Sequence, residues 1–391
     1  MTDQTHIAAA EAGHINARLV TNTAHARQAF PDAPHLLNNA NMGRAFDTIS
    51  NWPGYTPTPL VDLPEIATHC GVARVVYKDE STRLGLGAFK ALGGAYAVAD
   101  LVREQMESGI NAGEVTVATA TDGNHGRSVA WGAQLAGCNA KIYIHEHVSK
   151  ARETAMQAYG AEVIRVQGNY EVSLADCKAD AEAHGWHLVS DTSWEGYVDV
   201  PRAIMAGYTV MGREIIDQLG KDELTHAFLP IGVGGLAAGV AAPLWAHMGA
   251  QLCNLISIES AMSCCFADSI AAGKPTLFDI TEETLMAGLS CGEVSLVAWE
   301  ILQPSLSHSM AISDEAVAPL MRWFHERSPS IEAGECSTSG LAGLLQAHKN
   351  PQHWQSMDFD ANSVVLLIGT EGATDPDLYA KIISGNQSHA E

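Results

Sequence analysis

The sequence predicts an α/β protein built from two parallel sheets with helices packed on them. The prediction depends on short apolar runs, rich in β-branched residues, that alternate with segments of helical composition in two separate series. A strand, a helix and a second strand at this spacing form a parallel βαβ unit. The first series has its expected strands at 114–120, 140–146, 161–167 and 186–192.

The second series lies in the C-terminal half, with expected strands at 225–231, 254–260 and 363–369. An expected helix at 200–220 lies between the two series and can carry the chain from one sheet to the other. We therefore predict a small α/β domain at 97–205, inserted into a large domain formed by 1–96 and 206–391. The active site is expected in the cleft between the two domains.

Composition and charge indicate a globular enzyme. The chain has 391 residues, enough for two domains, and 47% of them are hydrophobic while 17% are charged. Its net charge is −23, and its 22 Lys and Arg residues are spread along the chain. Nucleic-acid binding is therefore not expected, because it requires clustered basic side chains against the phosphates.

Neither secretion nor a membrane span is expected. The first 20 residues contain acidic side chains and no continuous apolar segment, so we predict a cytoplasmic protein. The longest uncharged run, 227–250, is long enough to cross a membrane, but it is mostly Gly and Ala and contains Pro230 and Pro243. This composition argues against a membrane span.

The sequence gives only weak indications of a disulfide or a metal site. The eight cysteines lack the spacing of a disulfide framework and are interpreted as reduced, mostly buried thiols, with a redox pair between Cys265 and Cys291 as the alternative. His145 and His147 can share one face at a strand end, but no third ligand is apparent, so no metal is expected.

The glycine-rich stretch 232–239 follows an expected strand and begins a helix. Backbone N–H groups at such a turn, together with the helix dipole, can bind an anion without a basic side chain. The stretch also fits a dinucleotide fingerprint, with Glu259 at the end of the next strand as a candidate ribose-binding acid. By itself it leaves three readings open: a nicotinamide or flavin nucleotide, a phosphorylated cofactor or substrate, and a structural turn.

A second glycine-rich stretch, 81–98, contains Lys90 at the start of an apolar helix. A lysine there either lies on the surface with its stem along the helix or is buried. Burial removes hydration, lowers the pKa of the amine and makes it a usable nucleophile. Lys90 is therefore a candidate nucleophile.

The motifs "FKALGG" (89–94), "DGNHG" (122–126) and "GVGG" (232–235), in this order, resemble the fold-type II pyridoxal-phosphate enzymes, the tryptophan-synthase-β-like family. The resemblance implies pyridoxal 5'-phosphate as cofactor, with Lys90 as the Schiff-base lysine and Asn124 facing the phenolic oxygen. The implied phosphate-binding residues are Gly232, Val233, Gly234, Gly235 and Leu236.

Thr370 is implied as the neighbour of the pyridine nitrogen. A hydroxyl there does not enforce a protonated ring, which favours elimination from Cβ over transamination.

Longer blocks resemble the diaminopropionate ammonia-lyases more closely. This resemblance covers about residues 45–380 and implies elimination of 2,3-diaminopropionate, both D and L, to pyruvate and two ammonia, by a homodimer acting on a small amino acid. The segment 327–343 departs from the family pattern and leaves the substrate preference open. The matching blocks are 52–60, 78–98, 120–126, 190–197, 201–208, 286–293 and 369–375.

Asp122 stands where serine and threonine dehydratases of the wider family have a small residue, often Ser or Ala. An acid there can bind a second ammonium group and accept the Cα proton on the face away from Lys90. Because the resembled family accepts both enantiomers, Asp122 is the implied second base, and Asp191 the implied partner that holds the amine or tunes Asp122. Two close carboxylates would raise one pKa. The alternatives are a helix cap for Asp122 and a chain-turning loop residue for Asp191.

Two other functions stay open. One is β-elimination from serine, threonine or another 3-substituted alanine. The other is a nicotinamide-dependent dehydrogenase that uses 232–239 and Glu259, which leaves Lys90 and the "DGNHG" turn unexplained. His125 within this turn is interpreted as a structural residue.

Overall fold

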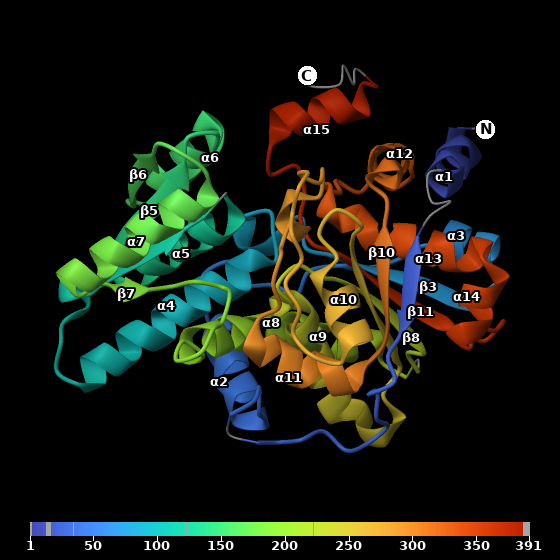
Figure 1. Ribbon diagram of the computed structural model, residues 1–391, viewed down its shortest axis with the longest axis horizontal. Coiled ribbons are helices and arrows are strands. Elements are labelled where there is room, and N and C mark those ends of the chain that lie inside the picture. The colour runs from blue at the N-terminus through green and yellow to red at the C-terminus, as the bar shows by residue number, and fades with distance from the viewer. Residues whose placement is uncertain (1, 13–16, 34, 122, 222, 386–391) are drawn as a thin grey trace.

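The computed structural model describes residues 2–12, 17–33, 35–121, 123–221 and 223–385. The chain forms one sheet of seven strands, in the order β1-β10-β9-β8-β11-β3-β2, and one of four strands, in the order β6-β5-β4-β7 (Figure 1). The large sheet contains β1 (Arg18–Thr21), β2 (Leu60–Asp62), β3 (Arg74–Asp79), β8 (His226–Pro230), β9 (Asn254–Ser260), β10 (Leu306–Ile312) and β11 (Val364–Gly369). The small sheet contains β4 (Thr116–Ala120), β5 (Asn139–His145), β6 (Glu162–Val166) and β7 (His187–Leu188).

The seven strands predicted from the sequence are all present and lie in the two sheets as expected, although β7 has only two residues. The small sheet is parallel throughout. The large sheet is parallel from β10 to β3, but both edge strands are antiparallel, β1 to β10 and β2 to β3. The two sheets are therefore parallel as predicted, except for the two edge strands of the large sheet.

Strand β10 was missed because its sequence, LSHSMAI, is not a continuous apolar run. It is nevertheless fully buried, and its polar side chains are hydrogen-bonded inside the protein. The hydroxyl of Ser307 donates to Leu255 O at 3.0 Å, and the hydroxyls of Ser257 and Ser309 are 2.8 Å apart. These bonds allow a polar strand to be buried inside the large sheet, next to its edge strand β1.

Alternate residues of the large sheet face two different helical layers, as the pleat of a strand requires. In β8, Ala227 and Leu229 lie in one hydrophobic core and Phe228 in the other. The first layer contains α2 (Asn39–Ile49), α8 (Asp199–Leu219), α9 (Gly235–Met248), α10 (Cys265–Ala272) and α11 (Leu296–Ser305). The second contains α1 (Thr2–Ala12), α3 (Pro64–Cys70), α12 (Val317–Glu326), α13 (Ser339–Lys349), α14 (Pro351–Ser356) and α15 (Pro376–Ile383).

The small sheet has the same alternation. Val117 and Ile142 face the core that also contains α4 (Lys90–Glu107) and α5 (Asn124–Ala136), while Ala118 and Tyr143 face α7 (Tyr170–His184). The remaining helix, α6 (Lys150–Gln157), follows β5. One continuous core thus joins both sheets through α4, α8 and α9. The proposed domain boundaries fall inside α4 and α8, and the division at these residues stays a prediction.

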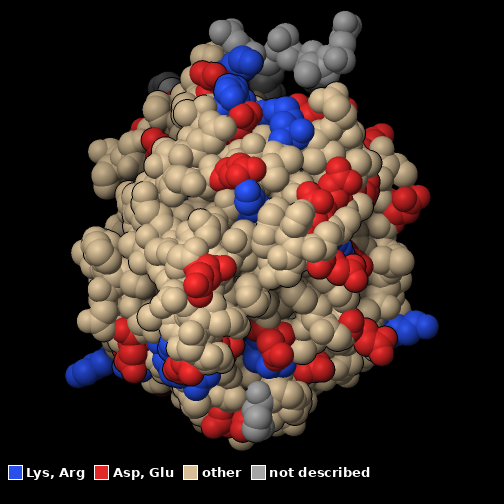
Figure 2. Space-filling model, turned by 90° about the vertical axis from the view of Figure 1, so that its left-hand side faces the viewer, with Lys and Arg blue, Asp and Glu red and all other residues tan. Residues whose placement is uncertain are grey.

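The long uncharged run 227–250 forms β8 and most of the buried helix α9. Within the described part of the chain, no helix is both long and apolar enough to cross a membrane. On the face shown in Figure 2, basic side chains are interspersed with acidic ones rather than gathered in one surface.

Candidate active site

The predicted site residues follow the carboxyl ends of strands in both sheets. Lys90 begins α4 after β3, and Thr370 directly follows β11. Asn124 begins α5 after β4, and Asp191 lies three residues after β7. Ligands of α/β proteins bind at this edge of a parallel sheet. The two sheets therefore supply opposite walls of one site.

Three side-chain contacts join these walls. Lys90 Nζ donates to Asp191 Oδ2 at 2.9 Å, and Asn124 Nδ2 donates to Glu371 Oε2 at 2.7 Å. Beside them, the hydroxyl oxygens of Ser193 and Ser295 are 2.6 Å apart. Residues more than 100 positions apart in the sequence are thus brought into direct contact.

The Lys90–Asp191 pair lies partly open, with exposed side-chain fractions of 22% and 25%. Burial opposes both charges, but Asp191 raises the pKa of Lys90 well above its ordinary value, and Lys90 holds the pKa of Asp191 well below its usual range. The expectation of a lowered lysine pKa is therefore wrong for this state, because a carboxylate contacts the amine. The raised pKa expected for one carboxylate of the Asp122–Asp191 pair stays a prediction.

The glycine turn before α9 is tightly enclosed. Gly234 has φ +106°, and a Cβ on it would lie 2.7 Å from Ala298 Cβ. A Cβ on Gly232 would lie 2.9 Å from Cys291 Sγ, and Val233 O accepts a hydrogen bond from Ser295 N at 2.8 Å. Only glycine fits these two positions. The first N–H groups of α9, which have no intrahelical partner, remain for an anion.

The turn before α5 is stabilised by Thr121, whose hydroxyl oxygen accepts from Gly123 N and Gly126 N, both at 3.1 Å. His125 is buried, its Nε2 is 2.8 Å from Val189 O, and burial lowers its pKa, as expected for a structural residue. Asp122 lies outside the described residues. Its interpretations as a second base and as a helix cap both stay hypotheses.

Thr370 lies beside a residue that the sequence analysis did not identify. Its Oγ1 is 3.2 Å from Ser337 Oγ, which also donates to Glu371 O at 2.6 Å and accepts from Glu371 N at 2.8 Å. Burial raises the pKa of Glu371. Ser337 belongs to the segment 327–343, which departs from the family pattern. That departure was the only sequence feature that pointed to this segment as part of the site.

The structure removes the main support for a dinucleotide site. Glu259 is fully buried, and its carboxylate accepts from Phe266 N at 3.0 Å and Ala267 N at 2.6 Å, at the start of α10. Burial raises its pKa to about 8. A carboxylate used in this way is not available to a ribose.

The structure also bears on the candidate metal site and on the cysteine pair. No group of three or more His, Cys, Asp or Glu side chains in the described ranges could hold a metal ion, and the rings of His145 and His147 lie 5.9 Å apart. All eight cysteines have free thiols, with Cys265 Sγ 3.9 Å from Gly232 O, and the alternative pair with Cys291 is not formed.

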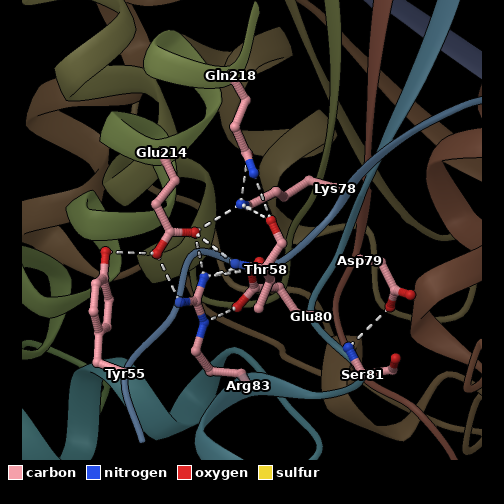
Figure 3. Close-up of polar contacts among 9 residues, drawn as sticks. All are labelled: Tyr55, Thr58, Lys78, Asp79, Glu80, Ser81, Arg83, Glu214 and Gln218. Carbon is pink, nitrogen blue, oxygen red and sulfur yellow. Dashed lines mark hydrogen bonds and ion pairs between the residues drawn. The ribbon is translucent and has the colours of Figure 1, made fainter. Parts of the chain in front are cut away.

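A buried ion cluster supports the segment that carries Lys90 (Figure 3). We use "ion cluster" for Lys78, Glu80, Arg83 and Glu214. Arg83 Nη2 donates to Glu80 Oε1 and Glu214 Oε2, both at 2.7 Å, and Lys78 Nζ donates to Glu214 Oε2 at 2.7 Å. The cluster joins the end of β3 and the turn after it to α8. Nothing in the local sequence indicated it.

A cavity of about 80 Å³ lies next to this turn. A larger open groove, of about 460 Å³, lies over α4 and contains none of the predicted site residues. The smaller cavity is lined by Gly85, Leu86, Gly87, Arg127, Glu332, Ala373 and Thr374.

Comparison with known proteins identifies the class. The family model described as "Pyridoxal-phosphate dependent enzyme" matches residues 52–368, so the chain belongs to the pyridoxal-phosphate-dependent enzymes. The fold class predicted from the sequence, a fold-type II enzyme with the site between two α/β units, is confirmed. The described residues fit the cofactor, since the structure contains a partly exposed lysine amine after β3 and an enclosed glycine turn at the N-terminus of a helix after β8.

Within that class the chain belongs to the diaminopropionate ammonia-lyase family. It is 38% identical to the Escherichia coli diaminopropionate ammonia-lyase over 349 residues, which cover 84% of this chain and 88% of the relative. The Salmonella typhimurium enzyme is 33% identical over 383 residues, 90% and 94% of the two chains. The crystal structure of the holo E. coli enzyme has a TM-score of 0.87 and 33% identity, and covers 96% of this chain and 98% of its own.

Proposed function

We propose that this enzyme eliminates ammonia from 2,3-diaminopropionate, accepting both the D and the L form, and produces pyruvate and two molecules of ammonia. The observation that carries the proposal is the 2.9 Å contact between the accessible Lys90 amine and Asp191, at the meeting point of the two sheets. A diamino substrate brings a second ammonium group, and Asp191 is an ionised carboxylate in position to bind one.

When bound, pyridoxal phosphate would withdraw electrons from Cα of the substrate and so make the Cα proton removable. Lys90 would hold the cofactor until substrate binds, and its amine would then take the Cα proton of one enantiomer. Asp191 remains ionised beside it and stabilises the ammonium that Lys90 becomes.

The other predicted site residues bind the cofactor and complete the proton transfers. The N–H groups from Gly232 to Leu236 would bind the phosphate of the cofactor, and Asn124 and Thr370 would hold its ring. Asp122 takes the Cα proton of the other enantiomer. The Cβ amino group leaves as ammonia, and the released enamine tautomerises and reacts with water to give pyruvate and the second ammonia.

The test combines spectroscopy with product analysis. The purified holoenzyme is mixed separately with D- and L-diaminopropionate, and its cofactor absorption and the pyruvate formed are followed in the same cuvette. Shifts of the band together with pyruvate from both enantiomers support the proposal. Pyruvate from serine or threonine but from neither diaminopropionate would instead indicate a dehydratase.

We further propose a cytoplasmic homodimer with a small inserted domain at 97–205. Family membership supports the homodimer, and the negative charge of the chain permits it. Light scattering coupled to gel filtration measures the mass, and a mass of one chain across micromolar concentrations would contradict the dimer.

A further inference from the structure

Glu371 links the two walls of the site through the side chain of Asn124. Asn124 is the first residue of α5, which follows β4 of the small sheet, and Glu371 lies two residues after the end of β11 in the large sheet. Asn124 Nδ2 donates to Glu371 Oε2 at 2.7 Å. The contact therefore joins a residue expected to hold the cofactor ring to a carboxylate that has no role in the sequence analysis.

Glu371 is held in place by the residues around it. Only 8% of the residue is exposed. Its backbone O accepts hydrogen bonds from Ser337 Oγ at 2.6 Å and from Gly334 N at 2.9 Å, and its N–H donates to Ser337 Oγ at 2.8 Å. A Cβ on Gly334 would lie 2.8 Å from Glu371 Cγ, so the base of the side chain is closely packed. The carboxylate therefore approaches Asn124 from a defined position.

The contact also decides which end of the Asn124 amide faces Glu371. Burial raises the pKa of Glu371, but the Cys336 side chain and Lys90 oppose this rise and favour the ionised form. An ionised carboxylate accepts hydrogen bonds and donates none, so the amide atom beside it is the nitrogen rather than the oxygen. The amide nitrogen has two N–H groups, and the contact with Glu371 Oε2 uses one of them. The second N–H group is directed elsewhere.

We propose that Glu371 is a positioning residue for the cofactor: it holds the Asn124 amide in the orientation that directs its second N–H group at the phenolic oxygen of pyridoxal phosphate. This inference rests on the proposed function, in which Asn124 holds the cofactor ring. Without Glu371 the amide could turn over and present its oxygen, which would repel the phenolic oxygen. Because Thr370 directly precedes Glu371, one short segment after β11 would then set both contacts to the ring.

The affinity of the full-length enzyme for pyridoxal phosphate tests this role, because it does not depend on the substrate. Glu371→Met keeps a side chain of similar length and removes the acceptor. We expect the dissociation constant of the cofactor to rise about tenfold, the effect of one hydrogen bond. The absorption maximum of the bound cofactor should move in the same direction as in Asn124→Ala. In an Asn124→Ala background, Glu371→Met should change the dissociation constant less than about twofold, since Glu371 then has no amide to hold.

Glu332→Ala is the matched control. Glu332 Oε1 accepts from Ala373 N at 2.9 Å, so this carboxylate stabilises the same segment after β11, whereas the Asn124 amide donates to Glu371. We expect the cofactor affinity of this variant to change less than about twofold. If Glu371→Met does not fold, Glu371→Gln replaces it. The amide oxygen of Gln is an uncharged and weaker acceptor, so a loss of about threefold is expected, again only when Asn124 is present.

An unchanged dissociation constant, or an equal loss with and without Asn124, would overturn the role of Glu371. A loss in Glu332→Ala as large as in Glu371→Met would also overturn it, because the segment as a whole would then be responsible. If the unaltered enzyme produces pyruvate from neither enantiomer, the proposed function fails, but the cofactor titrations still decide the role of Glu371. The two failures are therefore distinguished.

Discussion

Lys78 and Lys90, two lysines that pair with carboxylates from distant parts of the chain, differ in how completely their amines are bonded. Lys78 is fully buried and donates to Thr58 O, Glu214 Oε2 and Gln218 Oε1, at 2.7, 2.7 and 2.9 Å (Figure 3). Lys90 is 22% exposed and donates to Asp191 alone among described residues. Because an ammonium has three N–H groups, Lys78 is saturated and Lys90 is not.

The charge balance around the two lysines also differs. The ion cluster has two cations and two carboxylates, and the pKa of Glu214 is lowered because its cationic partners outweigh the burial that opposes ionisation. Burial is the main cause that lowers the pKa of Lys78, whereas Lys90 has a raised pKa from one carboxylate. The ion cluster, whose charges balance and whose Lys78 amine uses all its N–H groups, has a structural role. The Lys90–Asp191 pair lies in an open site, and its Lys90 amine has N–H groups left to bind other acceptors.

Lys90→Ala should have the largest effect. We expect kcat/KM to fall by about 10⁴-fold or more, because the amine that holds the cofactor and takes the Cα proton is lost. The free energy of unfolding should change by less than about 1 kcal/mol, since the side chain is partly exposed. Steady-state kinetics and urea unfolding measure the two quantities. More than about 1% residual activity would contradict the role of Lys90.

Glu214→Gln should have the opposite effect, a large loss of stability rather than of catalysis. Removing this carboxylate leaves Lys78 and Arg83 with one buried partner charge, so the free energy of unfolding should fall by about 3–5 kcal/mol. Asp217→Asn on the same helix is the control, because its ion pair with Arg213 is exposed and should contribute less than about 1 kcal/mol. If Glu214→Gln lowers the free energy of unfolding no more than Asp217→Asn does, the ion cluster does not have the structural role that distinguishes it from the active site.

Asp191→Asn tests the ion pair between Lys90 and Asp191 in the active site. We expect kcat to fall about 10²–10³-fold because the Lys90 ammonium loses its described carboxylate partner. The pKa of Lys90 should move down toward its ordinary value, so the residual activity should peak at lower pH. A pH profile of kcat measures both effects. Unchanged kcat would mean that Asp191 only turns the chain.

The smallest effect is expected at Glu335, next to the site. Burial, assisted by Glu371, raises its pKa to about 7, from an ordinary value of 4.5. Below pH 4.5 both states are protonated and the group has no effect; as pH rises from 4.5 to 7 folding requires proton uptake, so the group increasingly disfavours folding, and above 7 this penalty is constant. Glu335→Gln should therefore increase the free energy of unfolding at pH 8 by about 1–2 kcal/mol and give a smaller gain at pH 5. An equal gain at both pH values would contradict the raised pKa.

The sequence alone was sufficient for features that depend on neighbouring residues. Strands such as β4, β5, β8 and β9 were predictable because buried parallel strands are continuous apolar runs. The glycine turn at 232–235 and Lys90 were identifiable because a turn and a helix start have local signals. Strand β10, whose polar side chains are bonded only inside the folded molecule, had no such signal.

Tertiary structure decided which side chains meet. Asp191 contacts Lys90 across 101 positions, Asn124 reaches Glu371 across 247, and Glu214 joins Arg83 across 131. Ser337 has no local sequence signal that places it beside Thr370. Backbone preferences act over a few residues, whereas these contacts, and the pKa values that follow from them, depend on how α4, α8 and the two sheets pack together.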